Sequence, residues 1–233
     1  MKIDKADVVK AGHEDTWKYF ISAYNGYEAM RAYRHLIKDC LDRKKANFES
    51  IIKGEAEISE NEQYSFPPGD FVTVDGINIS LRFLVSIYAQ SFFQLGRNCF
   101  DYIAQIIAAF YCQGINFYYI DFGAVSKKKD GITDEHVRKF IEDIVASEEY
   151  KYLCDYNNTV KHNYDPGVSI SLKTDSLDMI GKMPSFEKDS RPYDAMDMDE
   201  QTKKIHQFAV DKYGELLKLI WPEKVVEDTG KRD

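Results

Sequence analysis

The sequence lacks the segments that would carry a chain into or across a membrane. Its start, Met1 to Lys5, has no apolar core of the kind that a signal peptide needs. The most apolar segment, Tyr102 to Cys112, has about half the length of a transmembrane helix. We therefore predict a cytoplasmic protein that makes no membrane contact.

Cysteine is scarce, and the four cysteines lie far apart with no paired spacing. A structural zinc site needs close pairs of Cys or His residues, and a disulfide framework is normally denser in a shorter chain. The expected state is four reduced, mostly buried thiols. These are Cys40, Cys99, Cys112 and Cys154.

The common catalytic signatures are also missing. The chain has no glycine-rich phosphate loop, no Gly-x-Ser-x-Gly turn and no His-Glu-x-x-His. No His follows a Glu by three residues, as it does in di-iron helical bundles. The sequence thus argues against the usual nucleotide triphosphatases, hydrolases and metalloenzymes, and we expect no cofactor and no metal.

Apolar residues make up 44% of the chain and aromatic residues 14%, which is enough to build a core, so we predict a folded protein. A length of 233 residues suits one large domain, or one domain with an embellishment. The formal net charge of −8 argues against a long basic surface for nucleic acid, although not against a small local patch.

Apolar residues spaced by three and four predict four helical stretches, about 15–52, 79–112, 133–162 and 199–221. In the first, Asn25-Gly26 is either a break into two helices or a small residue at a close crossing. In the third, Thr133 gives a clean helix start, and Ser147-Glu148-Glu149 restarts or continues the helix. In the second, Arg97 and Asp101 stand at i and i+4 and can pair.

Two other segments have short strand-like patterns. The alternation in Val168 to Leu172 predicts a strand, with a partner between Asp178 and Phe186. The run from Phe71 to Ile79 is either a small hairpin turning at Asp75-Gly76 or an extended lead-in to a helix capped by Asn78 or Ser80. We favour the lead-in, because no further strands stand nearby to complete a sheet.

These elements predict an all-α fold, an antiparallel helical bundle with long central helices and a small β-hairpin insertion near 168–188. The whole chain, 1–233, is expected to form one domain. Its core comprises 15–165 and 199–221, and the insertion 166–198 is expected to be irregular and acidic beyond Pro184. The polar tail, 223–233, is expected to be mobile.

One stretch has a chemical signature, Asn157-Asn158-Thr159-Val160-Lys161-His162. On a helix Asp155, Asn158, Thr159 and His162 share one face, and Lys161 and Lys151 add positive potential. Such a cluster can hold an imidazole in the fixed tautomer that an acid–base catalyst needs. The alternative, which residue chemistry alone favours, is that these residues cap the helix end and bind the following hairpin.

The long helix containing Arg97-Asn98-Cys99-Phe100-Asp101-Tyr102-Ile103-Ala104, followed by a later helix ending in Asn-x-x-Lys-His, resembles the HEPN superfamily of helical domains. Its catalytic members carry Arg, a polar residue, three further residues and His. Aligned on His162, the polar position is Asn158 and the Arg position falls on Asn157. The resemblance covers at most the region 80–160. It implies an antiparallel bundle, frequent homodimers, and roles in RNA cleavage, toxin–antitoxin pairs or phage defence.

Two hypotheses follow from this resemblance. In the first, the chain is a non-catalytic homodimeric module that works through protein–protein or nucleotide contacts, because Asn157 is too short and uncharged to replace the Arg. In the second, it is a metal-independent endoribonuclease. His162 would then be the acid–base, Asn158 would orient it, and Lys161 with an Arg recruited from another helix, Arg97 or Arg138, would face the RNA phosphate.

Overall fold

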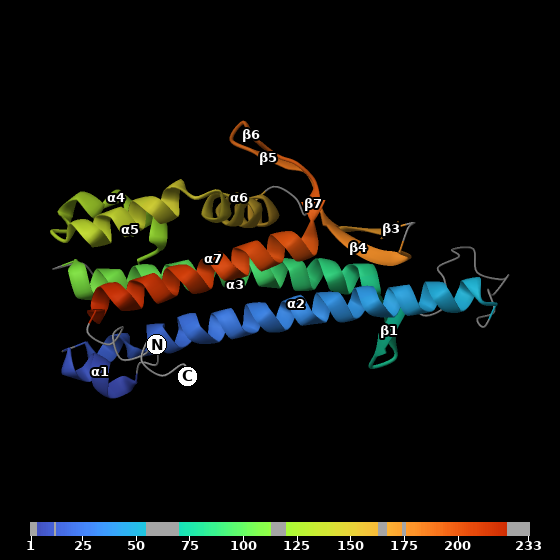
Figure 1. Ribbon diagram of the computed structural model, residues 1–233, viewed down its shortest axis with the longest axis horizontal. Coiled ribbons are helices and arrows are strands. Elements are labelled where there is room, and N and C mark those ends of the chain that lie inside the picture. Colours follow the sequence, from blue (N-terminus) through green and yellow to red (C-terminus); the bar gives the residue numbers. More distant parts are fainter. Residues whose placement is uncertain are drawn as a thin grey trace, which may run out of the picture. The chain divides into compact units, whose positions relative to one another are not determined.

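The computed structural model describes residues 4–11, 13–54, 70–112, 120–162, 167–173 and 176–222, and these are mostly helical with a few small antiparallel strand pairs (Figure 1). They fall into two compact units. Unit 1 comprises 1–30, 94–154 and 204–233, and unit 2 comprises 31–93 and 155–203. The predicted mobile tail lies outside the described residues.

The four predicted helical stretches are confirmed. The described helices are α1 (Lys5–Lys10), α2 (Trp17–Ile52), α3 (Leu81–Tyr111), α4 (Phe122–Lys127), α5 (Glu135–Ala146), α6 (Glu148–His162) and α7 (Met198–Ile220), with short 3-10 turns at Glu14–Thr16 and Lys129–Gly131. No helix in the described part of the chain is long and apolar enough to cross a membrane.

One helix start differs in detail from the sequence pattern, and another follows one of the two alternatives that the sequence left open. Asp134, one residue after the predicted Thr133, caps α5, because its carboxylate accepts from the backbone N–H groups of His136 and Val137. The chain restarts at Ser147 instead of continuing. The Ser147 hydroxyl donates to the Ile144 carbonyl at 2.7 Å and accepts from the Tyr150 N–H at 3.3 Å, which ends α5 and begins α6.

In unit 1, Gly26 lies at a close crossing of α2 and α3. Helix α2 runs through Asn25-Gly26 without a break, so the second of the two alternatives is correct. A Cβ at Gly26 would lie 2.5 Å from the Cys99 Sγ, which is fully buried. The surrounding core is aromatic, and Phe100 packs its ring against Phe122 and Tyr150.

In unit 2, residues 71–80 form a hairpin, so the favoured prediction of an extended lead-in was wrong. Strands β1 (Phe71–Val74) and β2 (Ile77–Ser80) pair antiparallel. Asp75 and Gly76 both have positive φ (51° and 78°), the conformation that two-residue hairpin turns require. The cap was predicted correctly, because the Ser80 hydroxyl accepts from the Phe83 N–H at the start of α3.

The second strand region of unit 2 is richer than predicted. Strand β3 (Ser169–Lys173) pairs with β4 (Asp178–Met183), the partner expected there. The stretch after Pro184 is not irregular, because it contains the hairpin β5 (Phe186–Lys188) and β6 (Arg191–Tyr193), and then β7 (Met196–Asp197), which pairs with β4. Strands of two and three residues are too short to show alternation in a sequence.

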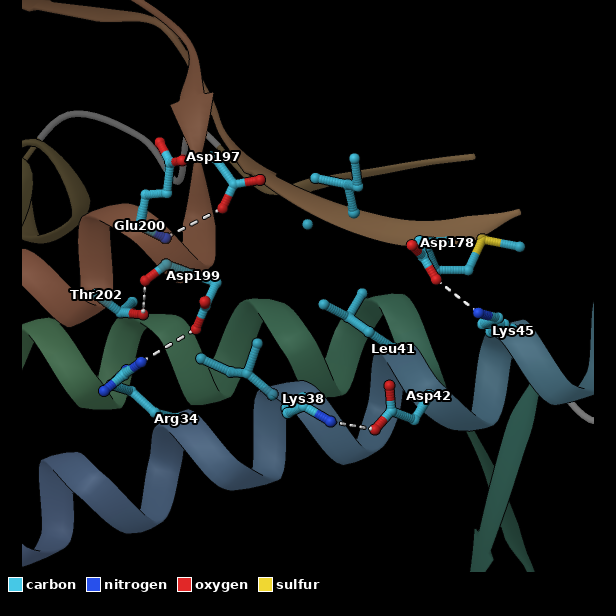
Figure 2. A pocket seen from close by; sticks show the side chains of 14 residues that line it. Arg34, Lys38, Leu41, Asp42, Lys45, Asp178, Asp197, Asp199, Glu200 and Thr202 are labelled. Carbon is cyan, nitrogen blue, oxygen red and sulfur yellow. Dashed lines mark hydrogen bonds and ion pairs between the residues drawn. The ribbon is translucent and has the colours of Figure 1, made fainter. Parts of the chain in front are cut away.

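The β3–β4–β7 sheet is held against α2. The Lys45 ammonium donates to the Asp178 carboxylate at 2.5 Å (Figure 2). This bond lowers the pKa of Asp178, so the ion pair stabilises unit 2 at neutral pH and is lost as the pH falls through that lowered value. Beneath the strand, a Cβ at Gly181 would lie 3.3 Å from the Met198 sulfur and 3.5 Å from Leu41, so the absence of a side chain lets β4 approach the helices closely.

Candidate functional site

The predicted site lies on the last turns of α6, the helix that carries Asn157 to His162. Lys161 and His162 occupy its final turn, where positive charge is favoured by the helix dipole. The four predicted site residues differ sharply in exposure. Asn157 is buried, whereas Asn158, Lys161 and His162 are exposed.

Asn157, which stands where the HEPN resemblance expects an arginine, is part of the packing of unit 2. Its side chain is 5% exposed. Its amide nitrogen donates to the backbone carbonyl of Phe93 on α3 at 2.9 Å. The preceding residue reinforces this contact, because the rings of Tyr156 and Phe93 lie 4.6 Å apart. The amide of Asn157 therefore joins two helices from inside unit 2.

The four residues that share one helical face do not form a cluster. Thr159 is fully buried, whereas Asn158 and His162 are exposed. Among the described residues, no hydrogen bond or ion pair joins His162 to Asp155, Asn158 or Thr159. Within that part of the chain, the imidazole has no side chain to fix its tautomer.

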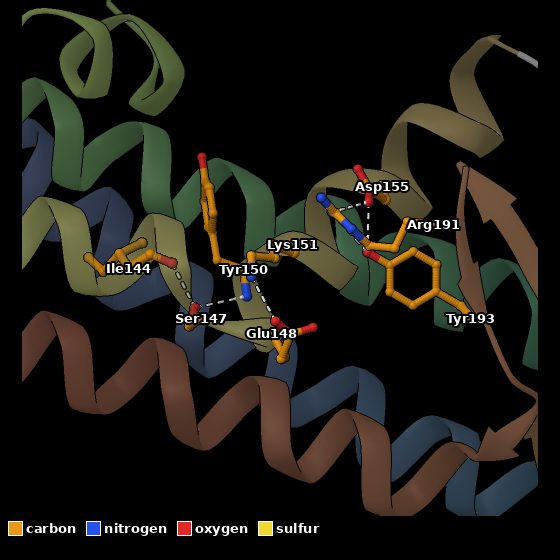
Figure 3. A network of polar contacts seen from close by, with 8 residues as sticks. All are labelled: Ile144, Ser147, Glu148, Tyr150, Lys151, Asp155, Arg191 and Tyr193. Carbon is orange, nitrogen blue, oxygen red and sulfur yellow. Dashed lines mark hydrogen bonds and ion pairs between the residues drawn. The ribbon is translucent and has the colours of Figure 1, made fainter. Parts of the chain in front are cut away.

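Asp155 holds the β5–β6 hairpin (Figure 3). Its Oδ2 accepts from Arg191 Nη1 at 2.8 Å and from the Tyr193 hydroxyl at 2.6 Å. Its side chain is 15% exposed. Burial raises the pKa of Tyr193 to about 12, so this phenol keeps its proton at neutral pH and donates. Aromatic packing completes the attachment, because Phe186 stacks on Tyr193 at 4.6 Å and meets Tyr156 edge-on at 5.8 Å. The sequence predicted that the end of this helix binds the hairpin near 168–188, whereas Asp155 binds the β5–β6 hairpin, in a stretch that was expected to be irregular.

Replacing Asp155 with Ala is expected to loosen the hairpin, because Arg191 and Tyr193 lose their shared acceptor. A hydrogen bond to a charged group contributes about 1.5–3 kcal/mol, and the exposed part of this network lowers that to about 1–2 kcal/mol of unfolding free energy. Hydrogen exchange of the amides in 186–193 should become roughly tenfold faster. Glu187→Ala, on the exposed side of the same hairpin, is the control and should leave both quantities unchanged. Equal exchange in the two variants would contradict the role of Asp155.

The basic residues considered for a catalytic role are engaged elsewhere. Arg97 donates to the Tyr150 hydroxyl at 2.6 Å and, as its spacing predicts, pairs with Asp101 at 3.5 Å. Arg138 Nη1 donates to the Ile132 carbonyl at 2.5 Å. Lys151 pairs with Glu148 at 2.7 Å. Lys161, which is exposed, has no ion pair among the described residues.

Metal ligands are not gathered in the described part of the chain, where no group of three or more His, Cys, Asp or Glu side chains could hold an ion. All four cysteines are thiols outside any disulfide, with Cys40 and Cys99 buried and Cys112 and Cys154 partly exposed. Comparison with known proteins finds no family model, no curated protein and no solved structure that matches the chain.

A groove in unit 2 was not predicted from the sequence. It has a volume of about 500 Å³ and is lined by residues of α2, β4 and the start of α7. Its lining residues come from segments more than 100 positions apart, and one wall is a strand whose partners the sequence pattern only partly locates. The segment Arg34 to Lys45 of α2, which carries charges of both signs, was the single local signal, and such a segment is also typical of a solvated helix face.

Proposed function

We propose that this chain is a non-catalytic helical module of the HEPN type, which works by binding other macromolecules in a defence or stress response. One observation supports this above all. The Asn157 side chain, which takes the place of the catalytic arginine, is buried and hydrogen-bonded to the Phe93 carbonyl at 2.9 Å. A residue used in this way is not available to an RNA phosphate, and an amide cannot supply the charge that stabilises the transition state.

The proposal includes the antiparallel bundle and the homodimer that the resemblance implies. The exposure of Asn158, Lys161 and His162 favours one alternative, a metal-independent endoribonuclease with RNA contact near His162. In that reaction His162 would take the proton of the attacking 2′-hydroxyl, and the charged phosphate would need a cation beside it. Lys161 is the exposed cation nearest in sequence, and it is the residue on which the alternative depends.

An RNA cleavage assay distinguishes the two functions. The wild-type chain, in EDTA and with both single-stranded and hairpin RNA, is expected to cleave no faster than His162→Ala or than buffer alone. Lys161→Ala should likewise show no RNA cleavage above that of buffer alone. Since both substituted side chains are exposed, the variants should keep the wild-type thermal unfolding midpoint. Sedimentation of the same samples reports whether two chains of 27.0 kDa associate. Reproducible cleavage by the wild type that disappears in His162→Ala would overturn the proposal.

A further inference from the structure

The groove of unit 2 is bounded by residues of four elements, α2, β4, β7 and α7 (Figure 2). Helix α2 forms one wall from Arg34 to Lys45, strand β4 forms the opposite wall from Asp178 to Gly181, and Asp197 with the first turn of α7 closes one end. The α2 wall is about 16 Å long, at 1.5 Å per helical residue. A wall of this length matches about four or five residues of an extended chain, at about 3.3 Å per residue.

Strand β4 presents a free edge to this groove. On one edge β4 pairs with β3 from Asp178 to Lys182. On the other edge β7 pairs only with Lys182 and Met183, because the chain turns into α7 at Met198. In the described part of the chain, no strand covers the second edge from Asp178 to Gly181.

The groove borders the stretch of β4 whose second edge is unpaired among the described residues. All four consecutive residues of β4, Asp178 to Gly181, line it. Gly181 has no side chain, so its backbone lines the groove directly. The N–H and C=O groups of alternate residues point to each edge. Two of the four residues therefore turn their backbone donor and acceptor to that unpaired edge, where an added strand would meet them.

The floor of the groove is apolar. Its apolar lining consists of Ile37, which is 4% exposed, and Leu41 from α2, and of Met179 and Ile180 from β4. An extended chain that adds to β4 would turn every second side chain toward this floor. Aliphatic residues at those positions would be removed from water, at about 25 cal/mol per Å² of apolar surface buried.

The charges of the groove favour a basic ligand. Five carboxylates and three basic side chains line it, an excess of two negative charges. Each basic side chain already has an acidic partner: Arg34 pairs with Asp199 at 3.1 Å, Lys38 with Asp42 at 2.7 Å and Lys45 with Asp178 at 2.5 Å. Asp197 and Glu200, at the end of the groove where α7 begins, have no ion pair among the described residues, although the Asp197 carboxylate also accepts from the Glu200 backbone N–H at 3.1 Å.

We propose that the groove binds an extended segment of a partner protein, which adds as a strand to the free edge of β4. The segment has about four or five residues, with aliphatic side chains at alternate positions and a Lys or Arg toward Asp197 and Glu200. Main-chain hydrogen bonds hold the segment, and the floor and the two carboxylates select its sequence. This inference rests on the proposed function, since it names the surface and the class of partner of the binding module.

Peptide selection tests this directly. Random heptapeptides displayed on phage are selected on the full-length chain. Enriched sequences are expected to alternate aliphatic residues with polar ones and to carry at least one Lys or Arg. Binding of the resynthesised, fluorescein-labelled peptide is then measured by anisotropy. Glu200→Lys should weaken it about tenfold, because it places a like charge at the selecting end. Glu187→Lys makes the same charge change on the β5–β6 hairpin, outside the groove, and should leave binding unchanged.

A scan of backbone N-methylated versions of the selected peptide, on the wild-type chain, tests strand addition itself. Methylation should abolish binding at every second peptide bond and be tolerated at the bonds between, because only alternate N–H groups face β4. The proposal is overturned if no peptide is enriched, if the peptide binds Glu200→Lys as well as wild type, or if the scan shows no alternation. Spermidine binding without peptide binding would assign the groove to a small cation. Self-association lost in Glu200→Lys would assign it to a second copy. RNA cleavage that depends on His162 would instead contradict the proposed function, whatever the peptides do.

Discussion

Asn157→Arg, which places an arginine where the proposed HEPN resemblance expects one, is expected to lower the free energy of unfolding by about 3–5 kcal/mol and to produce no RNA cleavage. The side chain at this position is 5% exposed and donates to the Phe93 carbonyl. A guanidinium here would lose its hydration without gaining a carboxylate, and an unpaired buried charge has a cost of this size. Urea denaturation followed by circular dichroism measures the loss.

The neighbouring residue provides a matched control for this substitution. Asn158→Arg makes the same replacement on the same helix, but the side chain of Asn158 is exposed. Its unfolding free energy should lie within about 0.5 kcal/mol of wild type. If Asn157→Arg were as stable as Asn158→Arg and cleaved RNA in EDTA, the helix end would be an active site lacking a single residue. That result would overturn the non-catalytic proposal.

The contrast between Asn157 and Asn158 shows what a motif read from residue types leaves out. Both are asparagines, and only the phase of the helix separates them. Leu153 and Tyr156 lie on the buried stripe of α6, and a step of four from Leu153 reaches Asn157 and not Asn158. The phase follows from the spacing of the apolar residues alone. This phase places position 157, where the HEPN resemblance expects an arginine, in the interior of the protein.

The long helices were predictable because their apolar stripes repeat over many turns, so a single misplaced residue changes little. The elements that were missed or wrongly predicted are strands too short to show a repeating pattern in the sequence. The strands Arg191–Tyr193 and Met196–Asp197 gain their partners from other parts of the chain, and the β1–β2 hairpin depends on the backbone conformation at Asp75-Gly76. The groove depends on pairing between distant segments, since its free edge exists because β7 is shorter than β4.

Where two helices cross, the effect of one methyl group can be measured, and Gly26 is the site where we expect it to be large. Gly26→Ala should gain up to about 1 kcal/mol from helix propensity. Overpacking opposes this gain, because the new Cβ would lie 2.5 Å from the Cys99 Sγ. The Sγ is enclosed, and burial raises the pKa of this thiol to about 12. Since a clash in a close-packed core typically costs about 1–3 kcal/mol and this one is severe, we expect a net loss of about 2 kcal/mol.

A double-mutant cycle shows whether this loss arises at the crossing. Cys99→Ala alone should cost about 1–2 kcal/mol for the cavity it leaves, but in its presence Gly26→Ala becomes harmless, because the new methyl occupies the space of the lost sulfur. The coupling energy is then about 2–3 kcal/mol. Gly214→Ala on α7 is the control, since no atom lies within 4 Å of its added Cβ, and this variant should be slightly more stable than wild type. Additive effects, or a Gly26→Ala variant stabilised like Gly214→Ala, would mean that α2 and α3 do not cross closely here, and that Asn25-Gly26 has the other role that its sequence allowed.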